Sequence, residues 1–208
     1  MARSQDLWLV PIVCPECGKG LPAKEDDVIF FCMVCQAAWE LSGDSLVRRE
    51  LFVVSGGGEL QLPFWVFPFK VSTPDGNFDT MEAFHLLIGN VNPVPEPQRG
   101  KPPLLFAPAF SSGRSQQMLR TGKLLTVRNP YLTAAKRELT GTSPITLGEA
   151  VAKEMARIIA IATITAERQK NLRFVKSLSL QFGRGRLCII PFDMRDNRLF
   201  NGEFNLEI

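Results

Sequence analysis

Two cysteine pairs near the start of the chain constrain its fold more than any other feature. Cys14 and Cys17 form one Cys-x-x-Cys pair, and Cys32 and Cys35 form a second pair after fourteen intervening residues. Two thiol pairs at such spacing are typical of a tetrahedral metal site, and a set of four sulfur ligands favours zinc. We therefore expect Cys14, Cys17, Cys32 and Cys35 to bind Zn²⁺. Iron held by four thiolates is the alternative.

Short segments with strand composition lead into both cysteine pairs. Leu7–Val13 and Val28–Phe31 are rich in branched and aromatic residues, which predicts a strand before each pair. Residues 37–52 predict a hairpin with its turn at 42–44, and Trp39 is expected to cover one side of the metal. With the CPECG sequence of its first pair, this arrangement resembles the zinc ribbon over residues 8–50. The second pair departs from that pattern, because Gln36 stands where such knuckles often have glycine.

The metal site is expected to be structural. A closed set of four thiolates leaves no coordination position for water or substrate. Metal binding of this kind supplies on the order of 10 kcal/mol of folding free energy to a small lobe that cannot bury a large core. The resemblance to zinc ribbons therefore predicts a rigid lobe and not a reaction centre.

Three consecutive glycines at 56–58 mark the expected domain boundary, with a zinc ribbon at 1–54 and a second domain at 55–208. The aromatic segment Leu60–Val71 contains Pro63 and Pro68, which predicts an edge or bulged strand. Leu187–Asp193 repeats its apolar-Pro-Phe pattern, so the two segments are expected in one sheet. Over residues 10–130 the chain also resembles uncharacterised bacterial proteins that join a zinc ribbon to a domain with a Pro-Phe-Trp strand. That resemblance implies a domain layout and no activity.

Three helices are expected in the second domain. One covers Phe78–Ile88, capped by Asp79 or Thr80, and one covers 111–120 and ends near Gly122. The longest covers 146–170, where Thr146 and Glu149 fit a capping box. Its apolar stripe predicts the core-facing side, with a dimerisation seam as the alternative; the stripe consists of Val151, Met155, Ile158, Ala162 and Thr165, and Ile159 and Ile161 widen it.

These elements predict an α+β fold class. We expect a small N-terminal zinc ribbon followed by a mainly antiparallel β domain with one long helix and one or two short helices. No apolar run is long enough for a membrane span, and the N-terminus lacks the pattern of a secretory signal. Metal-ligating cysteines fit a reducing compartment, so a cytoplasmic location without membrane insertion is expected.

Charge divides the chain into two halves. Residues 1–98 carry a net charge of −7 and residues 99–208 a net charge of +10, which sum to +3. Either the halves attract one another, or the basic half binds an anionic partner. Four cations are candidates for phosphate contacts: Arg173, Lys176, Arg184 and Arg186.

No catalytic motif accompanies these features. His85 is the single histidine, and Cys188 lies within an apolar strand, where a thiol behaves as a small hydrophobe. We therefore expect a non-catalytic protein-interaction or assembly module that binds a protein partner or itself. We expect Phe64, Trp65 and Phe67 to contact this partner. Side chains alternate along a strand, so part of this aromatic set would be exposed unless both sheet faces are covered. Nucleic-acid or transcription-associated binding through the basic half is the alternative, although acidic residues 25–27 disfavour phosphate contacts by the ribbon itself.

Overall fold

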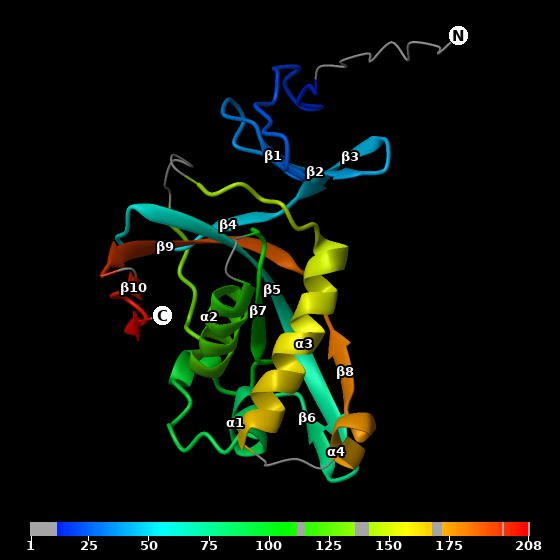
Figure 1. Cartoon of the computed structure of the whole chain (residues 1–208), viewed down its shortest axis with the longest axis vertical. Helices are drawn as coiled ribbons and strands as arrows, with labels where there is room; N and C mark the ends of the chain where they lie inside the picture. Colours follow the sequence, from blue (N-terminus) through cyan, green and yellow to red (C-terminus); the bar gives the residue numbers. More distant parts are fainter. Residues whose placement is uncertain (1–11, 112–114, 136–141, 168–171, 197, 208) are drawn as a thin grey trace.

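The chain folds into the predicted α+β architecture, with the cysteine lobe at one end of a larger sheet-and-helix body (Figure 1). The structure is a computed structural model that describes residues 12–111, 115–135, 142–167, 172–196 and 198–207. The predicted strand at Leu7–Val13 lies mostly outside these residues. Its last residue, Val13, forms an isolated antiparallel bridge with Gly20.

The N-terminal lobe contains an antiparallel sheet of β1 (Ile29–Phe31), β2 (Ala38–Ser42) and β3 (Ser45–Arg49), in that order. Register pairs Phe30 with Trp39, and the β2–β3 hairpin closes at Ser42 and Ser45. Both the strand before Cys32 and the hairpin after Cys35 are confirmed, because branched and aromatic composition and turn residues are local signals.

The larger sheet is organised around β5 (Leu60–Thr73), which has partners on both edges. On one edge it pairs with β9 (Arg186–Arg195) and then β8 (Ser179–Phe182). On its other edge it pairs with β7 (Leu104–Pro108) and then β6 (Gly76–Phe78). The prediction of an edge strand is wrong, whereas the two segments with the repeated Pro-Phe pattern do pair in one sheet.

Both prolines of β5 face places where a neighbouring strand is interrupted. Within a strand, the N–H and C=O of one residue point to the same neighbour. The carbonyl of Pro63 accepts from Ala109, just beyond the end of β7, and that of Pro68 accepts from Gly183. Between β8 and β9, residues 183–185 oppose only 67–68 of β5, so one extra residue forms a bulge. The missing N–H of each proline therefore costs no ladder hydrogen bond.

The remaining strands extend the outer edge of β9. β4 (Leu51–Val53) pairs with it in parallel, directly after the N-terminal lobe. The C-terminal hairpin of β10 (Arg198–Asn201) and β11 (Leu206–Glu207) continues the sheet from residues 193–195 of β9.

In the described ranges, four α-helices and a short 3₁₀ turn complete the fold. They are α1 (Met81–Leu87), η1 (Glu96–Gln98), α2 (Ser115–Arg128), α3 (Glu149–Glu167) and α4 (Leu172–Ser177). The predicted Thr80 cap of α1 is confirmed, since its Oγ1 accepts from the N–H of Ala83 at 3.3 Å. The prediction that Gly122 ends α2 is wrong, because the helix continues through it to Arg128.

Side chains of α2 and of Asn129, the residue after it, form hydrogen bonds with the backbone groups on the open edge of β7. Thr126 Oγ1 accepts from the N–H of Phe106 at 3.1 Å. Asn129 bonds both backbone groups of Leu104, accepting from its N–H at 3.2 Å and donating to its carbonyl at 2.5 Å. These contacts satisfy an edge that would otherwise pair with another chain.

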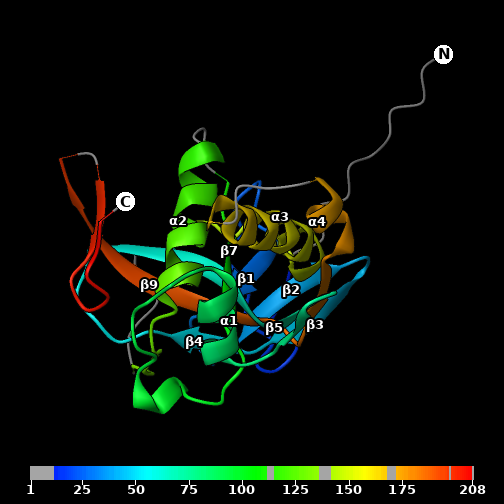
Figure 2. The ribbon, with the colours of Figure 1, turned by 90° about the horizontal axis from the view of Figure 1, so that it is seen from below.

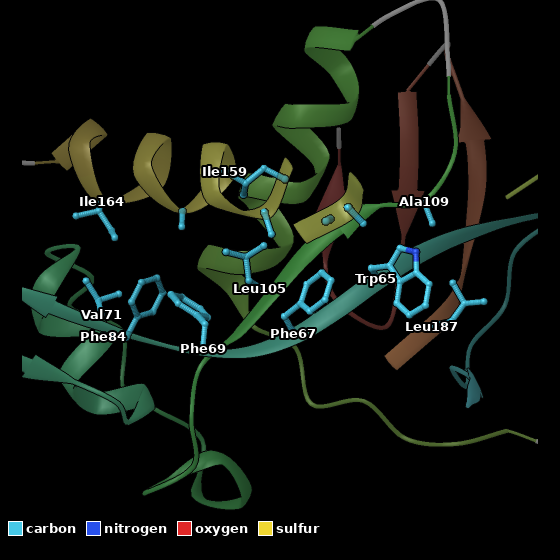
Figure 3. Packing of buried hydrophobic residues seen from close by; sticks show 14 of the residues in the cluster. Trp65, Phe67, Phe69, Val71, Phe84, Leu105, Ala109, Ile159, Ile164 and Leu187 are labelled. Atoms are coloured by element: carbon cyan, nitrogen blue, oxygen red, sulfur yellow. The ribbon is translucent and has the colours of Figure 1, made fainter. Parts of the chain in front are cut away.

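Side chains cover both faces of the central sheet. On one face, Trp65, Phe67 and Phe69 lie in a row beneath Ile159 and Ile164 of α3 (Figure 3). On the other face, Phe64 and Val66 pack with Leu125 of α2 and with the C-terminal hairpin. Helix α2 lies beside β7 (Figure 2) and contributes to both clusters, with Leu119 and Val127 packed against the first and Leu125 within the second.

Candidate metal centre

The four cysteines of the two pairs converge in the N-terminal lobe. Their Sγ atoms all lie within 4.8 Å of one another, with Cys14 Sγ 3.5 Å from Cys35 Sγ and Cys17 Sγ 3.4 Å from Cys32 Sγ. A tetrahedron of sulfurs about 2.3 Å from a central metal has edges of roughly 3.8 Å. The donor set therefore fits a metal ion, and none of the four cysteines is in a disulfide.

The two knuckles have the same backbone geometry. In each, the residue after the second cysteine donates its N–H to the carbonyl of the first: Gly18 to Cys14 and Gln36 to Cys32, both at 2.8 Å. Both residues have positive φ, 67° for Gly18 and 58° for Gln36. The second knuckle thus keeps the turn without glycine, and Gln36 bears the cost of a left-handed conformation.

Backbone N–H groups point at the first sulfur of each knuckle. The N–H groups of Cys35 and Val34 lower the pKa of Cys32 to about 6, against the effect of burial. Burial opposes ionisation of Cys14 as well, but the N–H groups of Cys17 and Glu16 lower its pKa overall. These paired contacts stabilise thiolates, which are the form that binds metal.

The second thiol of each knuckle has a raised pKa instead of a lowered one. Burial raises the pKa of Cys35 to about 12. The N–H of Lys19 lowers the pKa of Cys17, yet the adjacent thiol of Cys32 and burial raise it overall. Four thiolates at these distances repel one another unless a cation lies between them, so the electrostatics of the cluster match a bound metal ion.

An apolar wall surrounds the sulfurs. Leu21, Phe30, Ala37 and Trp39 are buried around Cys14 and Cys32, as expected for Trp39. Side chains of β2 alternate, so Trp39 faces the cysteines while Ala38 and Glu40 face the larger sheet. The lobe therefore has one metal face and one docking face.

A buried charge network connects the docking face to helix α3. Arg49 Nε donates to Glu40 Oε2 at 2.5 Å, and a terminal nitrogen of Arg49 lies 2.9 Å from Glu149 Oε2. Glu40 Oε1 accepts from the N–H of Glu149 at 3.0 Å, and the guanidinium lies 5.8 Å from the Trp65 ring centre. In this Glu40–Arg49–Glu149 network, the cysteine lobe supplies a hydrogen-bond acceptor for the first backbone N–H of α3.

This network replaces the capping box predicted from the sequence. Thr146 Oγ1 is buried without a hydrogen-bond partner, and α3 begins only at Glu149. The capping-box prediction is therefore wrong, because a carboxylate from a distant strand occupies the position that the threonine hydroxyl would take.

The aromatic residues predicted to contact a partner are inside the protein. Phe64, Trp65 and Phe67 are each 0% exposed. Trp65 Nε1 donates to the carbonyl of Leu147 at 2.9 Å, which satisfies its polar atom. The expectation that one aromatic set is exposed is wrong, because α3 covers one sheet face and the C-terminal hairpin together with Leu125 of α2 covers the other.

The four predicted cations do not gather on a single strand. Arg173 and Lys176 belong to α4, where Lys176 is exposed and the side chain of Arg173 lies outside the described residues. Arg184 is exposed in the bulge between β8 and β9. Arg186 lies on β9 with its guanidinium 5.2 Å from the Phe52 ring centre.

The two remaining reactive side chains have packed environments. Both ring nitrogens of His85 have partners, Nδ1 with the Asn92 carbonyl at 3.1 Å and Nε2 with Asn90 Nδ2 at 3.3 Å. Cys188 is fully buried, and that burial raises its pKa to about 12. Neither group is arranged as a nucleophile or base.

One exposed surface was misassigned from the sequence. Four residues of the predicted core stripe define what we call the α3 seam: Val151, Met155, Ile158 and Ala162. Val151 and Ile158 are 56% and 57% exposed, Ala162 is exposed and Met155 is half-buried. The buried side of α3 lies one residue further along, at Ala152, Ala156 and Ile159. The side chain of Thr165 lies outside the described residues.

Comparison of the chain with known protein families, curated proteins and solved structures finds no match. Among the described helices, none is both long enough and apolar enough to span a bilayer.

Proposed function

We propose that this is a non-catalytic zinc-ribbon protein that acts as an assembly module, and that its partner is a second copy of the same chain. Zinc is the metal that four thiolates in two knuckles favour, and a closed ligand set leaves no position for a substrate. Free thiols in place of disulfides fit a reducing compartment such as the cytoplasm.

The observation that carries this proposal is the exposed α3 seam. Its residues follow a spacing of four, three and four, which is the spacing of a helix-pairing stripe. A surface helix normally turns such residues to its own core, so the exposure of Val151, Ile158 and Ala162 supports contact with another helix. Met155 is half-buried against the core of its own chain.

Symmetry and charge favour a second copy as the occupant. In an antiparallel pair related by a two-fold axis, Met155 meets Ile158 of the other copy and Val151 meets Ala162. Glu154 and Arg157 flank the seam and form an exposed ion pair within one chain at 3.4 Å. The two-fold axis brings the Glu154 of each copy beside the Arg157 of the other, so the flanks attract one another. A single helix face forms a small interface, so the expected dimer is concentration-dependent.

Sedimentation equilibrium of the full chain tests this proposal. Wild type is expected to show a monomer–dimer equilibrium, and Ile158→Glu is expected to weaken it by at least roughly tenfold because it places a charge in the apolar seam. Val91→Glu is the matched control, since Val91 is 95% exposed and lies outside the seam. A wild-type chain that stays monomeric at about 100 µM, or a control that dissociates as readily as Ile158→Glu, overturns the proposal.

Nucleic-acid binding through the basic half is the alternative, supported by the net charge of +10 on residues 99–208. The placement of Lys176, Arg184 and Arg186 on a helix, a bulge and a strand supports it less well than one continuous basic stripe would.

A further inference from the structure

A second concave site lies away from both the cysteines and the α3 seam. It is a pocket of about 220 Å³ between η1, the start of β7, the segment after α2 and the start of β9. Its floor is apolar and includes Met81, Leu104 and Leu132. Pro102 and Pro130 add rigid walls, and the ring of Tyr131 lies at the mouth, 52% exposed.

The polar wall of this pocket is built by Asn129. This residue has a φ of 45°, a conformation that few residues other than glycine adopt. Its side chain bonds both backbone groups of Leu104 and donates to the Thr126 carbonyl at 3.1 Å, while Gln98 Nε2 donates to its carbonyl. Strained backbone that is held by buried hydrogen bonds often lines a binding site. The wall is therefore formed before any ligand arrives.

Two cations line the pocket and no carboxylate does. Lys101 and Arg186 contribute to the lining, and neither forms an ion pair with a carboxylate in the described part of the chain. The carboxylate of Glu82 is already bound to the N–H of Gly100, at 3.1 Å from each oxygen. The positive charge of the pocket is therefore not neutralised from within these residues.

Aromatic rings hold both cations without using their N–H donors. Lys101 Nζ lies 5.6 Å from the Tyr131 ring centre, and the Arg186 guanidinium stacks near Phe52. The side chain of Tyr131 is 52% exposed, so its hydroxyl adds a polar group at the mouth. A guanidinium is a typical receptor for carboxylate or phosphate oxygens.

We propose that this pocket binds a small organic anion in which a carboxylate or phosphate group is attached to a flat apolar ring. The anionic group would face Lys101, Arg186 and the Tyr131 hydroxyl, and the ring would enter between the prolines and the leucines. The volume of about 220 Å³ is sufficient for a single ring with its anionic group. The site shares no residue with the α3 seam, so it is independent of self-association.

Isothermal titration of the full zinc-loaded chain tests this site, with phenyl phosphate and benzoate as probes. Inorganic phosphate and benzyl alcohol are the matched probes that lack the ring or the charge. Phenyl phosphate or benzoate is expected to bind, and to bind more tightly than either matched probe. Arg186→Gln and Lys101→Gln are each expected to weaken binding roughly ten- to hundredfold, the usual loss for a hydrogen bond to a charged group. Lys101 is exposed, so its variant should fold even if Arg186→Gln does not.

Arg184→Gln is the matched control variant, because Arg184 is exposed and does not line the pocket. Its affinity for the organic anions is expected to equal that of wild type. Equal binding of benzyl alcohol, unchanged affinity in Lys101→Gln, or no heat from either organic anion at about 10 mM overturns the proposal. An oligonucleotide that binds more tightly than phenyl phosphate and responds equally to Arg184→Gln and Arg186→Gln also overturns it, in favour of a nucleic-acid surface.

Discussion

Single residues near the sulfurs decide how well each knuckle closes. The ligands themselves could be predicted, because the Cys-x-x-Cys spacing is a local signal and the turn that joins each pair is short. The conformation of Gln36 could not, since its side chain gives no indication of positive φ. In the structure it adopts nearly the same φ as Gly18, 58° against 67°, and holds its place with a side-chain bond from Nε2 to the Met33 carbonyl at 3.1 Å.

Gln36→Gly is therefore expected to stabilise the zinc-loaded protein by about 0.5–1 kcal/mol. The substitution removes the steric cost of a left-handed side chain, which exceeds the loss of one exposed hydrogen bond. Denaturant unfolding with saturating zinc measures the change. Gly18→Ala is the control with the opposite expected sign, because it introduces a Cβ at a φ of 67°. Equal signs for the two variants would contradict the idea that the knuckles share one geometry.

At the level of whole elements, composition predicted the existence of most strands and helices. It did not predict their order in the sheet or which of their faces would be buried. β5 was expected at an edge or with a bulge because it contains Pro63 and Pro68. It lies inside the sheet, and the interruptions that accommodate the prolines, a bulge at 183–185 among them, belong to neighbouring segments that are distant in the chain. The stripe assigned as the core face of α3 is centred one residue too early, although Ile159, which widens it, is buried in the core. Its buried side consists largely of alanines, Ala152, Ala156 and Ala160, which give a weak apolar signal while allowing close packing.

Close packing also explains why a glycine occupies position 122 inside helix α2. A Cβ at this position would lie 2.6 Å from the carbonyl oxygen of Phe106 and 2.7 Å from Ile159 Cδ1. Helix propensity alone favours alanine by about 1 kcal/mol, whereas overpacking costs about 1–3 kcal/mol and lies at the upper end of that range where a contact is with backbone, which cannot move aside.

Gly122→Ala is accordingly expected to lower the free energy of unfolding by about 1–2 kcal/mol. The control is Gln116→Ala at an exposed position of the same helix, where propensity should act alone and stabilise slightly. Urea denaturation followed by far-UV circular dichroism measures both. A stabilising Gly122→Ala would show that α2 does not press against β7 as the structure places it.

Across the whole molecule, the metal lobe and the larger sheet are joined by contacts that sequence reasoning had no means to find. The N–H of Val28 donates to the Ile145 carbonyl at 2.8 Å, and Ile29 and Ala38 pack in the same cluster as Trp65. Glu40 caps a helix that begins 109 residues later. The opposite net charges of the two halves do not explain these contacts, because the Glu40–Arg49 pair lies within residues 1–98 and the Arg49–Glu149 pair takes its cation from the acidic half.

The Glu40–Arg49–Glu149 network should therefore stabilise the docking of the lobe without taking part in metal binding. Glu40→Ala leaves the first N–H of α3 and one nitrogen of Arg49 without their acceptor. Because the Glu40 side chain is only 10% exposed, the expected loss is about 2 kcal/mol of unfolding free energy. Glu154→Ala, on the same helix but with a side chain 72% exposed, should change stability by less than about 0.5 kcal/mol.

Metal analysis separates this docking role from a role in the site itself. Glu40→Ala is expected to retain one zinc per chain, whereas the double variant Cys14→Ser with Cys17→Ser is expected to lose it, because half of the ligand set is gone. If Glu40→Ala also loses zinc, the lobe requires the network in order to fold around its metal. If it keeps both zinc and full stability, α3 does not depend on the lobe for its first turn. The expected result, zinc retained and stability reduced, would mean that the metal holds the lobe together while Glu40 fixes the lobe to the helix that bears the α3 seam.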